Sequence, residues 1–423
     1  MINTSMETDY IALEDQFGAH NYHPLPVVLE RGEGMFVWDV NGKRYYDFLS
    51  AYSAVNQGHC HPRIINALTE QAKTLTLTSR AFYNNRLGPF ESMLHKTFGY
   101  DQFLPMNTGA EAVETAIKLA RKWAYEVKGI PENQGNIVVC DGNFHGRTTT
   151  IVSFSSDPGS KNNFGPHTPG FISIPYNDLD AAKDVLNQVN TIGILFEPVQ
   201  GEAGVIVPDE TYISGLRSLC TQTKTLFIAD EIQTGLARTG SLLAVCGNCS
   251  CESSCERSSS YQRPDILILG KALGGGVYPV SGVLADHEVM DVIKPGQHGS
   301  TFGGNPLACA VATESLNVLM EEKLMLNARR MGVKFRKAMQ RLVDRKGLFS
   351  LVRGKGLLNA VVINDSPESD TAWNFCVALA ENGLLAKPTH GNIIRFAPPL
   401  IMDEAALEEC VGIIEQTFNQ FNS

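Results

Sequence analysis

The chain has 423 residues, of which 43% are hydrophobic and 19% charged, and its formal net charge is -10. This length predicts two or three domains, or one large α/β domain with a smaller companion. The acidic balance excludes nucleic acid and anionic membranes as principal partners, because both require a basic surface. No apolar run approaches the ~20 residues that a membrane span needs.

The N-terminal stretch MINTSMETDYIALEDQ contains no Lys or Arg and carries four acidic residues. Secretory and mitochondrial presequences both require early positive charge, so we expect a cytoplasmic protein. Further on, the glycines and the β-prone run of residues 32–39 predict a turn that leads into a strand. We expect this N-terminal segment, residues 1–52, to pack with the C-terminal part of the chain.

An Asn-Thr-Gly turn at residues 107–109 precedes a predicted helix. The stripe of Val113, Ala116, Ile117 and Ala120 has the spacing of a buried helix face. The free N–H groups and the dipole of such a helix start can bind an anion, with Gly109 allowing close approach and Thr108 offering a hydroxyl. An ordinary helix cap remains the alternative.

Four short apolar runs follow between residues 135 and 282, each ended abruptly by polar residues or glycine: 137–140, 192–196, 226–229 and 266–269. Continuous β-prone runs are typical of strands that are buried on both faces of a parallel sheet. We therefore predict an α/β fold with a mostly parallel-sheet large domain, residues 53–305. In such sheets the ligand lies beyond the carboxyl ends of the strands.

The residues directly after these runs are chemically active types. They include Asp141, Glu197, Asp230 with Glu231, and Lys271. A lysine at this edge can act as an amine nucleophile that forms a Schiff base. A pyridinium cofactor held in that way needs a carboxylate against its ring nitrogen, and Asp230 can supply it. A Walker phosphate loop is excluded, since the sequence has no G-x-x-x-x-G-K-[ST].

From about residue 306 the pattern changes. Helical spacing over 316–326 and 327–343 is followed by short β-prone segments at 357–363 and 393–396, and a last helix is predicted over 403–418. This mixture predicts a smaller α+β domain, residues 306–423.

Long motifs give the chain a family resemblance. MNTGAEAVETAIKLAR, GNFHGRT, EPVQGEAGV, DEIQTGLARTG, LGKALGGGVYPVSG and GSTFGGNP resemble the class-III pyridoxal-phosphate aminotransferases of fold type I. HNYHPLPVVL, LTLTSRAFYNN and LLAKPTHGNIIRFAPPL resemble, more narrowly, the ornithine aminotransferases. The resemblance runs from about residue 18 to the C-terminus. It implies an aspartate-aminotransferase-like fold with pyridoxal 5'-phosphate as the cofactor.

The resemblance also implies roles for cofactor-binding residues. Lys271 is similar to the Schiff-base lysine, which also moves the proton, Asp230 to the carboxylate at the ring nitrogen, and Phe144 to the aromatic residue that stacks on the ring. Gln233 matches the amide that binds the phenolic oxygen. The phosphate would be bound by Thr108, Gly109 and Ala110, and by Ser300 and Thr301 of the other subunit of a homodimer. His145 is interpreted as structural.

For substrates, the resemblance implies transfer of the terminal amino group of ornithine to 2-oxoglutarate by a ping-pong reaction, within proline biosynthesis and arginine catabolism. Tyr22 and Arg147, with Tyr52 nearby, match the residues that hold the α-amino and carboxylate group of ornithine. Arg395 matches the arginine that binds an α-carboxylate, and Glu202 the acid that masks it. An acetylornithine or 4-aminobutyrate aminotransferase is the nearest alternative.

Ten cysteines remain to be explained. Six are scattered singly and are expected to be reduced, as buried cytosolic thiols are. Cys246, Cys249, Cys251 and Cys255 form a C-x-x-C-x-C-x-x-x-C pattern in an insertion at about 246–260 that the resembling family lacks. A structural zinc site, a redox dithiol and a loop of free thiols are all open. A redox- or metal-sensing protein is the alternative from another class.

Overall fold

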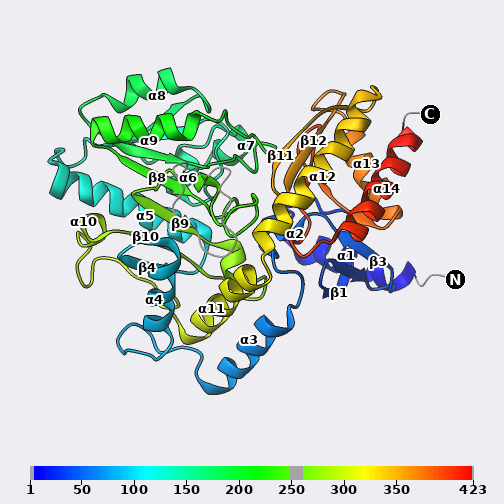
Figure 1. The fold of residues 1–423 in the computed structure, drawn as a ribbon, viewed down its shortest axis with the longest axis horizontal. Helices are drawn as coiled ribbons and strands as arrows, with labels where there is room; N and C mark the ends of the chain where they lie inside the picture. Colours follow the sequence, from blue (N-terminus) through cyan, green and yellow to red (C-terminus); the bar gives the residue numbers. More distant parts are fainter. Residues whose placement is uncertain (1–3, 247–260, 422–423) are drawn as a thin grey trace.

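The structure, a computed structural model, describes residues 4–246 and 261–421. It has two parts, which lie side by side in Figure 1. The larger part is built on a seven-stranded sheet, and the smaller part holds two four-stranded sheets, one of which combines strands from both ends of the chain. Each described helix is too short or too polar to cross a membrane.

The seven-stranded sheet has the order β4-β10-β9-β8-β7-β5-β6. Strands β6, β5, β7, β8 and β9 are parallel, and β10 runs antiparallel to both β9 and β4. The predicted α/β class with a mostly parallel sheet is therefore confirmed. The strands are β4 (Gln102–Met106), β5 (Asn136–Cys140), β6 (Phe171–Ile174), β7 (Thr191–Phe196), β8 (Leu226–Asp230), β9 (Ile266–Leu269) and β10 (Ser281–Ala285).

Both faces of this sheet are covered, which explains the continuous apolar runs. Successive residues of β8 point to opposite faces: Phe227 packs in the same cluster as Leu216 of α9 (Tyr212–Thr223), and Ile228 packs with Ile117 of α5 (Gly109–Trp123). The predicted helix stripe on α5 is buried throughout. The helices thus fix which end of each strand is open to a ligand.

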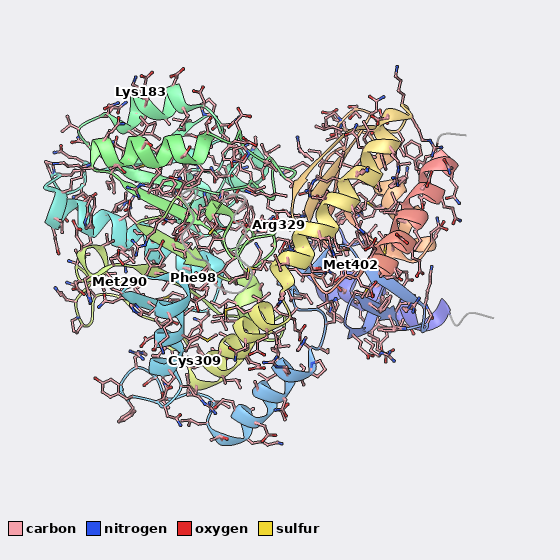
Figure 2. The ribbon with its side chains drawn as sticks, viewed as in Figure 1. Phe98, Lys183, Met290, Cys309, Arg329 and Met402 are labelled. Atoms are coloured by element: carbon pink, nitrogen blue, oxygen red, sulfur yellow. The ribbon has the colours of Figure 1, made fainter. Side chains whose placement is uncertain are left out.

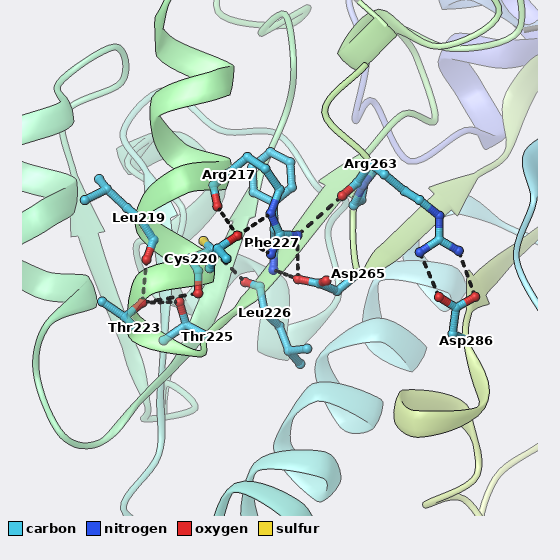
Figure 3. A network of polar contacts seen from close by, with 12 residues as sticks. Arg217, Leu219, Cys220, Thr223, Thr225, Leu226, Phe227, Arg263, Asp265 and Asp286 are labelled. Atoms are coloured by element: carbon cyan, nitrogen blue, oxygen red, sulfur yellow. Dashed lines mark hydrogen bonds and ion pairs between the residues drawn. The ribbon is translucent and has the colours of Figure 1, made fainter. Parts of the chain in front are cut away.

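A polar network holds the amino-terminal ends of β8 and β9 (Figure 3). Asp265 accepts hydrogen bonds from Phe227 N at 2.7 Å and from Arg217 Nη1 at 2.9 Å. Arg263 binds both carboxylate oxygens of Asp286 at 2.7 Å. These contacts set the register of the two strands whose other ends carry Asp230 and Lys271.

The smaller part contains the sheets β1-β2-β3-β13 and β11-β12-β15-β14. Strand β13 pairs in parallel with β3, so the first fifty residues do pack with the C-terminal part, as predicted. The strands are β1 (Leu29–Glu33), β2 (Phe36–Asp39), β3 (Arg44–Asp47), β11 (Phe349–Lys355), β12 (Leu358–Ile363), β13 (Leu384–Leu385), β14 (Lys387–His390) and β15 (Ile393–Phe396).

The helical region after residue 306 differs from the prediction in one place. The break between α11 (Pro306–Glu321) and α12 (Leu324–Asp344) falls at Lys323, where φ is +53°, and not between residues 326 and 327. A lysine in the left-handed region has no sequence signal, so helical spacing alone misplaced the break. Helix α11 packs on α3 (Pro62–Thr74) and α4 (Leu87–Phe98), whereas α12 packs on β11. The domain boundaries at 52 and 305 stay predictions.

The remaining elements are short or peripheral. The last predicted helix is α14 (Glu404–Phe421), and α13 (Thr371–Glu381) lies beside it. The others are α1 (Thr4–Phe17), α2 (Ser50–Ser53), the π-helix η1 (Ala124–Lys128), α6 (Thr149–Ser153), α7 (Pro158–Lys161), α8 (Leu179–Leu186), the 3₁₀ turns η2 (Ala244–Cys246) and η3 (Lys271–Gly274), and α10 (His287–Met290).

Two buried or partly buried arginines join the two parts of the molecule. Arg238 is fully buried and donates hydrogen bonds to Asn56 Oδ1, Leu357 O and Pro398 O. Its burial lowers the pKa of the guanidinium group to about 9. Arg329 of α12, which lies between the two parts in Figure 2, donates from Nε and Nη2 to Gly240 O at 3.0 and 2.8 Å. The junction is therefore polar and specific, and it adjoins the carboxyl edge of the large sheet.

Helix α12 needs a glycine where it meets this junction. A Cβ on Gly332 would lie 1.8 Å from Gly356 O, whereas a Cβ on Gly412 of α14 would meet nothing within 4 Å. Gly332→Ala should therefore lower the free energy of unfolding by roughly 1–3 kcal/mol through overpacking. The matched change Gly412→Ala should raise it by about 0.5–1 kcal/mol, since alanine favours helix. Urea unfolding of both variants checks this; equal effects would contradict the packing.

Candidate active site

A cavity of ≈ 200 Å³ lies beyond the carboxyl ends of β7, β8 and β9. Its lining includes six residues that the family resemblance assigns to cofactor binding: Gly109, Ala110, Phe144, Asp230, Gln233 and Lys271. The parallel sheet brings them together because the carboxyl ends of neighbouring strands share one edge. The structure thus assembles most of the predicted set in one place.

Lys271 is the first residue of η3, separated from β9 by Gly270, and its backbone has a φ of +45°. Burial lowers the pKa of its ammonium group, while the carboxylates of Glu202 and Asp230 act in the opposite direction. A lysine with a lowered pKa is neutral in a larger fraction of molecules, and the neutral amine is the nucleophile. The left-handed backbone is strained for lysine, which is common where geometry serves a site.

Asp230 ends β8 and is 5% exposed. Its Oδ2 lies 2.7 Å from His145 Nδ1, and its Oδ1 accepts a hydrogen bond from Ile232 N at 3.0 Å. No partner for His145 was predicted from the sequence, yet this buried contact fixes the orientation of the carboxylate. His145 Nε2 is buried without a hydrogen-bond partner among the described residues.

The start of α5 is a helix cap that also adjoins the cavity. Thr108 is the helix cap: its Oγ1 accepts from Glu111 N at 3.3 Å, and the Glu111 carboxylate accepts from Thr108 N at 2.8 Å. The N–H groups of Gly109 and Ala110 remain at the cavity. Ser300 Oγ accepts from Asn107 Nδ2 of its own chain at 2.8 Å, beside this turn, whereas Thr301 is exposed. Their predicted contribution across a dimer stays a prediction.

Glu202 and Arg395 form the ion pair that the resemblance predicts. Arg395, on β15 and 1% exposed, donates from Nη1 to Glu202 Oε1 at 2.7 Å and from Nη2 to Oε2 at 3.4 Å. Gln233 joins them, because its Nε2 donates to Glu202 Oε1 at 2.9 Å and its Oε1 accepts from Arg395 at 3.2 Å. The Arg395 guanidinium also lies 4.7 Å from the centre of the Tyr52 ring. These contacts hold the pKa of Glu202 below its ordinary value against the opposing effect of burial.

The remaining predicted residues, Tyr22 and Arg147, lie next to the cavity-wall residue Phe144, at a position called the entrance below. The Arg147 guanidinium is 5.9 Å from the centre of the Tyr22 ring and 5.7 Å from that of Phe144. Tyr22 is 66% exposed and Arg147 is also exposed. An arginine and a phenol in open positions are suited to hold the far end of a substrate.

Two buried acids were noted in the sequence only as strand ends. Glu197 follows β7 and lines the cavity, where burial and the carboxylates of Asp230 and Glu202 raise its pKa well above the ordinary value. Glu231 follows Asp230 but points to η2, accepting hydrogen bonds from Val245 N at 2.9 Å and from Thr234 Oγ1. Their position directly after apolar strands was the sequence signal for a functional acid. The sequence did not indicate which of the two acids faces the cavity.

The predicted cysteine cluster lies mostly outside the described residues, since Cys249, Cys251 and Cys255 fall within 247–260. Cys246 is buried at the base of the insertion. In the part of the chain that the structure describes, no group of three or more His, Cys, Asp or Glu could hold a metal ion. Five of the six scattered cysteines are buried as expected, but Cys60 is exposed.

The cavity fits pyridoxal phosphate. The Lys271 amine, a buried carboxylate fixed by His145, and the N–H groups of a helix start match the aldehyde, ring nitrogen and phosphate of that molecule. Gly109 has no Cβ, and one placed there would lie 3.1 Å from Ile232 Cδ1.

Residues 17–418 match the family model of class-III aminotransferases. The chain belongs to the class-III aminotransferases. By identity it falls among the ornithine aminotransferases: it is 56% identical to the mitochondrial ornithine aminotransferase of Rattus norvegicus over 96% of this chain and 90% of that protein. Such enzymes depend on pyridoxal phosphate, so this aminotransferase does too.

Solved structures that resemble this chain carry two different names. The ornithine aminotransferase of Toxoplasma gondii is 47% identical, with a TM-score of 0.92 over 98% of this chain and 95% of that one. A structure named as the acetylornithine aminotransferase of Elizabethkingia anophelis is 57% identical, with a TM-score of 0.88 over 98% and 99%. The substrate of this aminotransferase therefore has to be argued from the site.

Glu231 predicts a pH dependence of stability. Burial raises its pKa from 4.5 to about 7. A raised folded-state pKa means that the folded chain keeps a proton that the unfolded chain releases, so stability falls as the pH rises from about 4.5 to about 7. The loss is roughly 2–3 kcal/mol between pH 5 and pH 8. In the Glu231→Gln variant, the free energy of unfolding should not show this loss between pH 5 and pH 8. Urea unfolding at both pH values measures it, and identical falls in both proteins would contradict the assignment.

Proposed function

We propose that this aminotransferase transfers the terminal amino group of L-ornithine to 2-oxoglutarate, giving glutamate 5-semialdehyde and L-glutamate. The observation that carries the proposal is the ion pair between Glu202 and Arg395. A single cavity has to accept ornithine by its terminal amine and glutamate by its α-amine. An arginine that is available for only one of these substrates solves that problem.

The cofactor supplies the electron sink for breaking the C–H bond next to the reacting nitrogen. The chain supplies the other functions. Lys271 provides the amine that holds the cofactor, and the same Nζ is placed to accept and return the proton of the reacting carbon. Asp230, oriented by His145, keeps a proton on the ring nitrogen. Phe144, in the cavity wall, is placed to stack on the ring.

In the ornithine half-reaction Arg395 must be masked. Left unpaired, its guanidinium would bind the α-carboxylate of ornithine and bring the α-amine to the reacting position. Glu202 binds both terminal nitrogens of Arg395 and Gln233 binds Nη1, which prevents this. Tyr22 and Arg147 at the entrance are then placed to hold the α-amino and carboxylate group, which leaves the terminal amine nearest Lys271.

In the second half-reaction a dicarboxylate requires the opposite state. The α-carboxylate of 2-oxoglutarate can displace Glu202 from Arg395, because it offers the guanidinium an equivalent bidentate partner. The side chain of Glu202 is 22% exposed, so it can turn toward solvent on release, while the buried Arg395 gains the substrate carboxylate as its partner. The free energy of binding 2-oxoglutarate to Arg395 thus drives the displacement of Glu202.

An acetylornithine aminotransferase is the second candidate, favoured by the Elizabethkingia structure. An acylated amine would have no ammonium group for the polar pair at the entrance. Tyr22 and Arg147 therefore favour free ornithine.

The proposal includes a homodimer that shares Ser300 and Thr301, a cytoplasmic location, and a place in proline biosynthesis and arginine catabolism. The family resemblance supports the dimer and the metabolic role. A zinc ion held by Cys246, Cys249, Cys251 and Cys255 stays a prediction, which metal analysis of the purified protein tests.

Lys271→Ala should remove the covalent link to the cofactor. Borohydride reduction of the wild-type protein, followed by peptide mass spectrometry, should place the cofactor on Lys271, and the variant should carry none. Lys128→Ala is the matched control, since Lys128 is also a half-buried lysine whose pKa burial lowers, but it binds Thr191 O away from the cavity. A cofactor adduct in the Lys271 variant would contradict the assignment.

Glu202→Ala should unmask Arg395 permanently. Losing a hydrogen-bonded charge partner is worth roughly 1.5–3 kcal/mol, so preference for the terminal over the α-amine should fall at least about tenfold. Product analysis with ornithine measures this preference. Glu409→Ala, which removes a remote acid bound to Tyr46, is the control. Unchanged regiochemistry in the Glu202 variant would end the masking hypothesis.

The function itself is tested by supplying ornithine and 2-oxoglutarate and following the cyclised product of the semialdehyde. N-acetylornithine is assayed in parallel. The proposal expects a higher kcat/KM for ornithine by at least about tenfold, the worth of one charged contact. A higher value for N-acetylornithine would favour the second candidate.

A further inference from the structure

Glu197 is a cavity-lining acid to which the reaction described so far gives no part. It is the first residue after β7 and is 9% exposed. Its Oε1 accepts a hydrogen bond from Phe144 N at 3.3 Å. Its Oε2 is buried and, among the described residues, has no hydrogen-bond partner. A buried oxygen left unpaired costs free energy unless a bound group completes it.

The surroundings of Glu197 differ from those of the other two acids at the cavity. Asp230 is bound by His145 and Ile232 N, and Glu202 by Arg395 and Gln233. Glu197 faces both of these carboxylates and, as the one opposing charge, Lys271. Burial and the two like charges raise its pKa well above the ordinary range. Of the three, it is the one whose negative charge has no cationic or side-chain hydrogen-bond partner among the described residues.

We propose that Glu197 is the neutral hydrogen-bond donor of this cavity, with its Oε2–H directed to the phenolic oxygen of the bound cofactor. That oxygen is the acceptor on the ring that carries negative charge when the ring nitrogen is protonated. A carboxylate there would repel it, whereas a protonated carboxyl binds it. The charge-assisted hydrogen bond is the stronger kind.

The state of Gln233 supports this assignment. The resemblance gives the phenolic oxygen to the Gln233 amide, whose Nε2 donates one of its two hydrogens to Glu202 and whose Oε1 accepts from Arg395 while the mask is closed. Glu197 provides a donor that does not depend on the mask. It can therefore serve both half-reactions, in which Gln233 changes its partners.

The backbone at Glu197 is also fixed. The Tyr176 hydroxyl group lies 3.0 Å from Glu197 O and 3.1 Å from Pro198 O, and Tyr176 packs against the hydrophobic core. The side chain thus leaves the end of β7 in one direction. A fixed donor costs little reorganisation when the ligand binds.

The test compares Glu197→Gln, which keeps a neutral donor, with Glu197→Met, which has similar length and no donor. Glu231→Gln is the matched control, since Glu231 is a buried strand-end acid that points away from the cavity. The first readout is the pH midpoint of the visible band of the lysine-linked cofactor, recorded without any amine substrate. The second is the Kd of the apoenzyme for pyridoxal phosphate.

Glu197→Met should raise the midpoint by roughly one pH unit, because the donor stabilises the phenolic charge once the linking nitrogen has lost its proton. It should weaken cofactor binding about tenfold, the worth of one charge-assisted hydrogen bond. Glu197→Gln should recover most of both effects, and Glu231→Gln should show neither.

Contrary outcomes are distinct. If both Glu197 variants lower the midpoint, Glu197 is ionised in the wild-type protein and the proposal is wrong. If neither variant changes midpoint or Kd, no hydrogen bond reaches the cofactor. Should the Met variant not fold, the infrared difference between wild type and Glu197→Gln decides: loss of the carbonyl stretch of an un-ionised carboxyl is expected, and its absence overturns the proposal. None of these readouts depends on which amine is the substrate.

Discussion

The ion pair between Glu202 and Arg395 is the interaction on which the account of this enzyme depends. It joins a loop at the carboxyl edge of the large sheet to strand β15 of the small part, and it places a buried cation at the cavity wall. A buried ion pair contributes little net stability, because desolvation offsets the attraction. Its role here is to keep Arg395 bound to Glu202, and therefore unavailable to the first substrate, when that substrate binds.

The fold provides this arrangement through simple constraints. Strands buried on both faces leave only their ends for polar groups, and parallel strands put those ends on one edge. Asp230 and Lys271 therefore approach each other although 247–260 intervenes between them along the chain. The polar network of Asp265 and Arg263 sets the register of the same two strands from the opposite end.

Much of this organisation was predictable from the sequence. The continuous apolar runs predicted the strands β5, β7, β8 and β9, and the apolar stripe on α5 predicted which face of that helix is buried. The long motifs assigned the residues of the cavity. The break at Lys323 was not predictable, because a left-handed lysine has no local signal. Glu197 and Glu231 also look alike in sequence; only the folded sheet sends one into the cavity and the other to the backbone of η2.

The central claim is that one cavity transfers the terminal nitrogen of ornithine while a masked arginine excludes the α-nitrogen. It is tested most directly with ornithine carrying ¹⁵N only at the terminal position, incubated with 2-oxoglutarate and the wild-type enzyme. Mass spectrometry of the glutamate formed should show the label in nearly all molecules at early times. Glutamate that is largely unlabelled would mean transfer from the α-position and would contradict the account.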